Sequence, residues 1–347
     1  MQQGCYMNQC DTRTADRSFV ATWQLILCLG VFTGIQYGAD ADDTRAVRHI
    51  ELTATLRILP AESGQLAVWI PVPQSSSFQS SIQVIRHAGL PLQRTCETGY
   101  GNEMLYGSGA LNGQGAVEFD ILWKVTRREI RLADSEPQEA LTDAARAVWL
   151  RGSSKVPIRG KPLELIDARQ LPAESWDQAR LFYDRVLGHM SYDKSRSGYG
   201  TGDAVWACSS GFGNCTDFHS LFLSLARSHE IPARFEIGYP LPASITQGEI
   251  PGYHCWAWFH EQKHGWTPVD ISEADRQPIL SEYYFGNLSA DRVAFSVGRN
   301  IELQPPQQGP TLNFFVEPYI EVDGKPVSDG VVRFSLSFRD VNAGTPE

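Results

Sequence analysis

The sequence predicts an α+β fold made of an N-terminal antiparallel β-sandwich, a mixed helical and β-sheet region, and a C-terminal β extension. Three observations support this prediction. Residues 49–58 alternate between apolar and polar side chains, which is the pattern of a half-buried strand. Beyond residue 136 the apolar residues recur with helical spacing instead. An aromatic run beginning at His254 alternates again, and strand-like patterns return after residue 291.

The elements of residues 45–130 fit one antiparallel sandwich domain. Each expected strand is either an alternating segment or a short apolar run bounded by proline or serine. Two small sheets packed face to face would bury the apolar side of every strand. The expected strands are residues 49–58, 66–70, 82–85 and 117–125.

The rest of the chain divides into three parts. A helix and a stretch containing proline and glycine link the sandwich to a second domain, which opens with another amphipathic helix. A β extension then ends the chain. The parts are 131–173 with a helix at 136–150, 174–290 with a helix at 174–190, and 291–347 with strand-like patterns at 313–316 and 331–338.

The first 41 residues have the composition of an export signal. Phe19–Ile35 is an uncharged, mostly apolar run that follows two arginines, and Ala39-Asp40-Ala41 offers a small-x-small cleavage site. We therefore expect residues 1–41 to be a signal peptide and the protein to be exported to the periplasm or cell envelope. An uncleaved membrane tether is the alternative, because this run is close to the length of a membrane span.

Composition bounds the class of protein. A hydrophobic content of 42% in 347 residues excludes a wholly disordered chain. The formal net charge of −10, without a basic stripe, argues against a nucleic-acid partner.

Cys215 lies where a nucleophile is favoured. Apolar residues such as Phe218 and Phe222 follow it with helical spacing, and Asn214 is a good N-cap, so Cys215 falls in the first turn of a helix. Unpaired N–H groups and partial positive charge there stabilise a thiolate and can donate to an oxyanion. The negative charge of Asp217 in the same turn opposes this effect. A buried structural cysteine is the alternative.

A thiol nucleophile needs a base, and the base needs an orienting group. His254 begins one strand-like run, and Asp270 ends another. With a turn around Gln262 the runs form a hairpin, which places His254 beside Asp270. His219, one helical turn after Cys215, is expected to pack in the core.

Residues 260–264 form a literal H-E-x-x-H, the zinc-protease signature. That motif needs a helix, whereas alternating aromatics before it and glycine and proline after it predict a turn. A zinc hydrolase through His260 and His264 is therefore the weaker alternative. Cys208, Cys215 and His219 lack the paired-cysteine spacing of a zinc site. We expect no metal and no organic cofactor.

Four blocks of sequence resemble the transglutaminase-like superfamily, in particular its exported bacterial members: 213–219, 231–234, 252–256 and 265–274. The resemblance implies a papain-like core, in which a helix carrying cysteine packs on an antiparallel sheet that supplies histidine and aspartate. It implies that Cys215 is the nucleophile, His254 the base and acid, and Asp270 the orienter. The Cys215 backbone N–H is the first oxyanion donor, and Trp206 is the candidate for the second.

The sequence thus predicts a thiol-dependent amide hydrolase or acyltransferase that acts on a protein or peptide through a thioester. Asn214-Cys215-Thr216 stands where cross-linking transglutaminases of animals have Gln-Cys-Trp, which argues against protein cross-linking. Hydrolysis is favoured because no feature of the sequence marks an amine-acceptor tunnel. A protein-glutamine gamma-glutamyltransferase proper and a non-catalytic cell-envelope binding module are the alternatives. The glycine-rich stretch 198–202 is expected to be a flexible flap, and a disulfide between Cys208 and Cys255 stays open.

Overall fold

The computed structural model describes residues 47–342, except for 60–62, 112, 114, 136–139 and 328–329. The predicted signal peptide, residues 1–41, lies outside the described residues. Within the described part, none of the helices is both long and apolar enough to cross a membrane.

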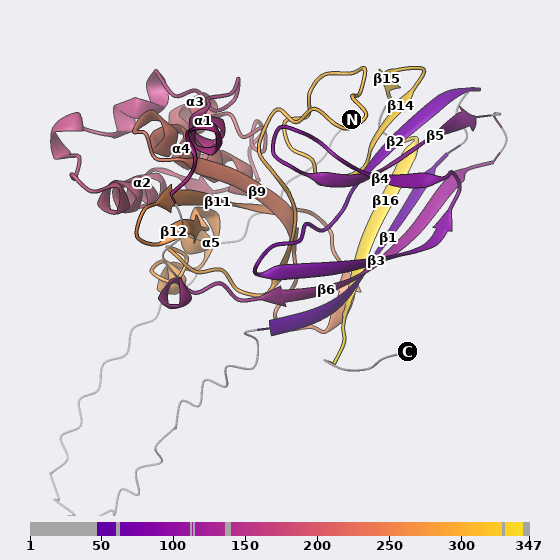
Figure 1. Ribbon diagram of the computed structural model, residues 1–347. Coiled ribbons are helices and arrows are strands. Elements are labelled where there is room, and N and C mark those ends of the chain that lie inside the picture. Colours follow the sequence, from indigo (N-terminus) through magenta and orange to yellow (C-terminus); the bar gives the residue numbers. More distant parts are fainter. Residues whose placement is uncertain are drawn as a thin grey trace, which may run out of the picture. The chain divides into compact units, whose positions relative to one another are not determined.

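Two five-stranded antiparallel sheets form the sandwich, and strands from the C-terminal part of the chain belong to both. In the first sheet β1 is central: it pairs with β6 on one side and with β16 on the other. Figure 1 shows β16, in yellow, beside β1, in indigo. The order is β10 (Gln247–Glu249), β16 (Val332–Asp340), β1 (Val47–Ile58), β6 (Val117–Arg128) and β3 (Gln79–Ala88).

The second sheet supplies the other side of the sandwich core. Alternate residues of β1, such as Leu52 and Leu56, share one hydrophobic cluster with Leu66 and Val68 of β2. This burial is what the alternating sequence pattern requires. The order is β15 (Lys325–Pro326), β14 (Tyr319–Val322), β2 (Gly64–Pro71), β5 (Glu103–Leu111) and β4 (Leu92–Cys96).

The C-terminal part is distributed over the molecule. Its first strand, β13, joins the sheet of the core, whereas β14, β15 and β16 complete the sandwich. The strand-like pattern at 313–316 is not a strand. Its buried carbonyl groups instead accept side-chain hydrogen bonds, from Ser296 to Phe315 and from Tyr239 to Val316. Side-chain donors here replace a β-ladder.

The core is an antiparallel four-stranded sheet with helices packed on it, as predicted. Its order is β12 (Gly265–Val269), β11 (His254–Glu261), β9 (Ala233–Pro240) and β13 (Arg292–Val297). Helices α2 and α4 contact β11, on one side of the sheet (Figure 1). The helices are α1 (Asp143–Leu150), α2 (Ser175–His189), α3 (Ala204–Ser210), α4 (Cys215–Ser228) and α5 (Ile271–Arg276).

Helix α4 is the centre of the core. The sequence predicts one apolar face, but every residue from Cys215 to Arg227 is buried. The buried polar side chains have partners: Ser220 accepts from Arg299, and Arg227 donates to the carbonyl groups of Ala233 and Arg151. A helix surrounded on all sides is tolerated because these partners offset the cost of burying polar groups.

Side chains from both parts of the chain join the sandwich to the core in one compact unit. The Gln79 side chain of β3 exchanges two hydrogen bonds with the backbone of Ala294 in β13, at 2.8 and 2.9 Å. Arg48 of β1, nearly buried, forms ion pairs with Asp291 at 2.7 Å and Asp340 at 2.8 Å. The sandwich thereby fixes β13, whose first residue, Arg292, lies beside the candidate site.

We predict that Leu336→Ala in β16 lowers the free energy of unfolding by about 2–5 kcal/mol, because it removes a buried side chain from the sandwich core. Urea denaturation followed by circular dichroism measures this change. Ser335→Ala, at the exposed neighbouring position, is the matched control and should change it by less than about 0.5 kcal/mol. Equal effects of the two substitutions would contradict the placement of β16 in the core.

Candidate active site

The N-terminus of α4 is built to present Cys215. The Asn214 side chain caps the helix by accepting from the N–H of Thr216 at 2.9 Å, and Asp217 closes a capping box by accepting from the N–H of Asn214 at 3.0 Å. The Asn214 carbonyl accepts from Asp217 and Phe218. Among the hydrogen bonds of the described residues, the Cys215 N–H has no acceptor. It is therefore a free donor beside the thiol.

Asp217 holds the glycine-rich loop as well as the start of the helix. Its carboxylate also accepts from the backbone N–H groups of Gly200 at 2.7 Å and Gly202 at 2.9 Å, so its charge is taken up by three backbone donors. The expected flap is therefore held against α4. Gly202 has a φ of +59°, and a Cβ there would lie 2.5 Å from the Thr216 side chain, so only glycine fits this close approach.

The hairpin of β11 and β12 brings His254 to Asp270. Ala257 pairs with Val269, so the turn is centred one residue later than the sequence predicts. Asp270 directly follows β12 and is the N-cap of α5. His254 Nε2 donates to Asp270 Oδ2 at 2.7 Å, and both side chains are buried.

The buried Asp270 carboxylate collects donors from several elements. Arg292 Nη1 of β13 donates to Oδ2 at 2.8 Å. Oδ1 accepts from the Ser272 hydroxyl and the Glu273 N–H, both at 3.1 Å. Burial alone would raise the pKa of this carboxyl, but the charges of His254 and Arg292 lower it below its usual range. Asp270 is therefore an anion that fixes the His254 ring.

Sequence reasoning missed Arg292. It lies in an otherwise apolar strand and is 4% exposed, with Asp270 as its ion-pair partner. The signal was a lone arginine at the start of an apolar strand, since arginine is almost never fully buried without a partner.

The charges of the site favour a thiolate and an imidazolium. A side-chain hydrogen bond with Cys255 lowers the pKa of Cys215 well below its ordinary value; burial opposes this, and the hydrogen bond and charge of His254 add to it. Burial would lower the pKa of His254, but Asp270 and Cys215 raise it to about 10. Both shifts favour the charged pair, a thiolate beside an imidazolium.

His219 packs in the core beside this pair. It is fully buried, accepts from the backbone N–H of Ile271 at 3.1 Å, and its Nε2 lies 3.7 Å from Asp270 Oδ1. Burial lowers its pKa to about 4, so the ring is neutral.

The other predicted residues lie apart from the site. His260 is on β11 and His264 in the turn, where their rings contact Trp266 and Trp176. The H-E-x-x-H segment is therefore not helical, and no group of three or more potential metal ligands occurs in the described part of the chain. Trp206 lies on α3 with its ring against Phe212. Its role as an oxyanion donor stays a prediction.

The four described cysteines are free thiols, so Cys208 and Cys255 are not joined in the structure. Cys208 donates to the carbonyl of Lys161 at 3.6 Å. Cys96 is exposed on the sandwich.

A cavity of about 630 Å³ opens beside His254. Its walls come from the end of β9, the residues before β11, α5 and the segment that precedes β13. Proline, tyrosine and leucine side chains supply much of the apolar lining, and arginine, glutamate and aspartate add charged groups. The lining includes Pro240, Pro242, Pro251, Glu273, Arg276, Tyr283 and Tyr284.

Comparison with known proteins agrees with this geometry. Residues 166–271 match the family described as the transglutaminase-like superfamily, in agreement with the resemblance seen in the sequence. An uncharacterized protein of Haemophilus influenzae is 31% identical over 184 residues, which cover 44% of this chain and 50% of that protein. The chain thus spans about half the length of this curated relative.

One solved structure resembles the chain in fold, and a second aligns with it at a lower TM-score. A protein of Cytophaga hutchinsonii designated a "putative cysteine protease" aligns over 86% of this chain and 93% of its own, with a TM-score of 0.55 and 10% identity. The periplasmic domain of TgpA from Pseudomonas aeruginosa aligns over 65% of this chain and 96% of its own, with a TM-score of 0.37 and 14% identity. Because the sequence identity to the Cytophaga hutchinsonii protein is only 10%, that likeness concerns the fold alone.

We predict that Cys215 is alkylated by iodoacetamide with a pH midpoint well below the ordinary thiol pKa of about 8.5. The lowered pKa keeps the thiolate present as the pH falls toward neutrality. In His254→Ala the imidazolium is lost, and the midpoint should rise by at least about one pH unit. Mass spectrometry of the labelled peptides reads each cysteine separately.

Exposed Cys96 is the internal control for this titration, because its pKa is raised by partial burial and by nearby Glu97 and Glu103. Its labelling should not respond to His254→Ala. A Cys215 that titrates as Cys96 does would contradict the thiolate–imidazolium pair.

We predict that Arg292→Met lowers the free energy of unfolding by about 3–5 kcal/mol, since it leaves the Asp270 carboxylate buried with one charge partner fewer. Arg276→Met is the matched control. That arginine pairs with Glu273, but its side chain is 52% exposed, so the loss should stay below about 1 kcal/mol. Urea denaturation of both variants checks the difference, and equal losses would argue against a buried ion pair.

Proposed function

We propose that this protein is a thiol-dependent amide hydrolase or acyltransferase, with Cys215 as nucleophile, His254 as general acid and base, and Asp270 as the orienting group. The observation that carries the proposal is the buried 2.7 Å hydrogen bond between His254 and Asp270, together with a cysteine at the N-terminus of α4 that is close enough to His254 for each group to shift the pKa of the other. The superfamily match over residues 166–271 supports the same class of chemistry.

Acylation follows from the charges of the site. The Cys215 thiolate attacks the carbonyl carbon of an amide, and a C–S bond forms. The oxyanion accepts from the free N–H of Cys215; one such donor is typically worth about 3–4 kcal/mol of barrier. The His254 imidazolium then gives its proton to the amine nitrogen as the C–N bond breaks, which leaves a thioester on Cys215.

Deacylation reverses the role of His254. Neutral His254 takes a proton from water or from an amine, and that nucleophile attacks the thioester carbonyl. Water yields hydrolysis, and an amine yields acyl transfer. His254 is suited to both directions because Asp270 holds its ring in one orientation.

The cavity beside His254 supports a protein or peptide as the substrate. Its proline and tyrosine walls suit an apolar side chain or an extended peptide, and its polar groups suit backbone amides. The acidic net charge argues against a nucleic-acid substrate. The uncharged run at Phe19–Ile35 supports export, so we place this activity in the periplasm or cell envelope.

The test incubates the protein with a mixture of glutamine-containing peptides in isotopically labelled water, with and without an added primary amine. We expect label in new carboxyl groups when hydrolysis dominates, and amine adducts when transfer dominates. Cys215→Ala should abolish both products, and mass spectrometry detects each. Product formation at the wild-type rate in Cys215→Ala would overturn the proposal.

Cys208→Ala is the control for loss of a buried thiol outside the site, and it should retain the activity of the wild type. If the wild type forms neither product although Cys215 titrates as a thiolate, the binding-module alternative gains support.

A further inference from the structure

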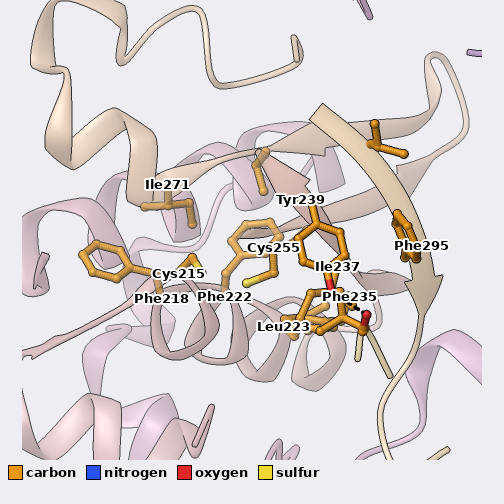
Figure 2. Close-up of a cluster of buried hydrophobic side chains, with 14 of the residues drawn as sticks. Cys215, Phe218, Phe222, Leu223, Phe235, Ile237, Tyr239, Cys255, Ile271 and Phe295 are labelled. Atoms are coloured by element: carbon orange, nitrogen blue, oxygen red, sulfur yellow. Dashed lines mark hydrogen bonds between the residues drawn. The ribbon is translucent and has the colours of Figure 1, made fainter. Parts of the chain in front are cut away.

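The first turn of α4 is held by polar contacts, whereas the following turns are held by the core. Figure 2 shows Phe218 and Phe222 within the hydrophobic cluster that α4 shares with the sheet, and both side chains are fully buried. Cys215 precedes them as the first residue of the helix. The orientation of its N–H therefore depends on the contacts that fix the helix start.

Arg299, two residues after β13, collects acceptors from several segments. It is 1% exposed, and its guanidinium lies over the Phe235 ring, 5.0 Å from the centroid. Nη1 donates to the Ser220 hydroxyl at 2.6 Å, Nη2 donates to the Gly202 carbonyl at 3.0 Å, and Nε and Nη2 both donate to the Asn313 side chain. Burial lowers the pKa of Arg299 to about 10, so the group is charged at neutral pH. A buried cation with only neutral acceptors is costly, which indicates that these contacts have a purpose.

The acceptors of Arg299 belong to the loop that Asp217 also holds. The peptide group between Thr201 and Gly202 is hydrogen-bonded at both ends. Its carbonyl accepts from Arg299 Nη2 at 3.4 Å and from Asn313 Nδ2 at 2.9 Å. Its N–H donates to Asp217 Oδ1 at 2.9 Å. A peptide polarised from both ends forms stronger hydrogen bonds than one bonded at a single end.

The Asp217 carboxylate passes this constraint to the helix start. Its Oδ2 accepts from the N–H of Asn214 at 3.0 Å and from the N–H of Gly200 at 2.7 Å. Asn214 supplies the carbonyl of the peptide group whose N–H belongs to Cys215. A chain of hydrogen bonds therefore runs from Arg299, through one peptide of the loop and Asp217, to the residue that orients the Cys215 N–H.

We propose that Arg299 is a positioning residue for the oxyanion donor: it holds the loop at residues 201–202, and through Asp217 this loop sets the direction of the Cys215 N–H. The inference rests on the proposed function, because that N–H is the oxyanion donor of the acylation step. In this role Arg299 contacts neither the thiol nor the substrate.

Two reactions of Cys215 separate this role from the reactivity of the thiol. When the thiolate attacks an ester carbonyl, negative charge develops on the carbonyl oxygen, and the N–H must point at that oxygen. When it attacks iodoacetamide, a C–S bond forms and iodide leaves, without an oxyanion. Both rates are proportional to the fraction of thiolate, so the ratio of acylation to alkylation reports on the oxyanion donor.

The test measures this ratio at one pH with p-nitrophenyl acetate as the acyl donor. A C–S bond forms, the ester C–O bond breaks, and p-nitrophenolate leaves; its release in Cys215→Ala is subtracted as background. In Arg299→Met we expect the ratio to fall by at least about tenfold, because misplacing a catalytic group by about 1 Å can cost about a hundredfold in rate. Mass spectrometry identifies the labelled cysteine.

Arg227→Met is the matched control. Arg227 is also a buried arginine that donates to backbone carbonyls, those of Ala233 and Arg151, but it lies at the other end of α4 from Cys215. Its loss should leave the ratio unchanged.

Thermal melting checks that each variant is folded. If Arg299→Met does not fold, Asn313→Ala replaces it, since this substitution removes the other donor to the Thr201 carbonyl and should also lower the ratio.

An unchanged ratio in the folded variant of Arg299 or Asn313, or an equal fall in Arg227→Met, would overturn the inference and leave the proposed function intact. So would a wild-type ratio at Cys215 no higher than that at exposed Cys96. An ordinary thiol midpoint for Cys215 in the wild type would overturn the proposed function as well.

Discussion

The buried carboxylate of Asp270 is the constraint on which the rest of the core depends. A charge removed from water costs several kcal/mol unless it is paired and hydrogen-bonded. Its donors come from the start of β11, from the first residue of β13 and from the first turn of α5, which Asp270 itself caps. The buried carboxylate is therefore stable only when β11 and β13 are in their native register and α5 begins at Asp270. The same contacts orient His254, so one set of hydrogen bonds determines both the stability of the core and the geometry of the site.

The sequence predicted what is local. An N-cap before an apolar stripe located the helix of Cys215, and two strand-like runs around a turn brought His254 near Asp270, within one residue of the true register. It did not predict that β16 would pair with β1 from the far end of the chain. Alternation shows which face of a strand is buried but not which strand lies beside it. Arg292 was missed for the same reason: its role depends on an ion pair with Asp270, which lies on another element.

Asp217 has a second task that its local charge does not reveal. Burial and the like charge of Cys215 raise the pKa of Asp217, so the repulsion that the sequence predicts is present. Its oxygens also accept from the N–H groups of Asn214, Gly200 and Gly202, and the last two lie in a loop whose approach the sequence does not reveal. The acid therefore holds the loop and the helix start together. The glycines of this loop allow close packing against α4: a Cβ on Gly202 would lie 2.5 Å from the Thr216 side chain.

The charges of the site also explain why it can be buried at all. Arg292, Asp270, His254 and Cys215 form a line of alternating sign, and in the thiolate–imidazolium state that line sums to zero. In the proposed reaction the tetrahedral oxyanion replaces the thiolate as the negative end, so the sum is unchanged. When His254 gives its proton to the departing amine, the thioester and the neutral imidazole leave Arg292 and Asp270 as a balanced pair. No step leaves a net charge in the low-dielectric core, where it would be most costly. In the proposed reaction the barrier therefore depends on hydrogen-bond donors at the α4 N-terminus rather than on a change in net charge.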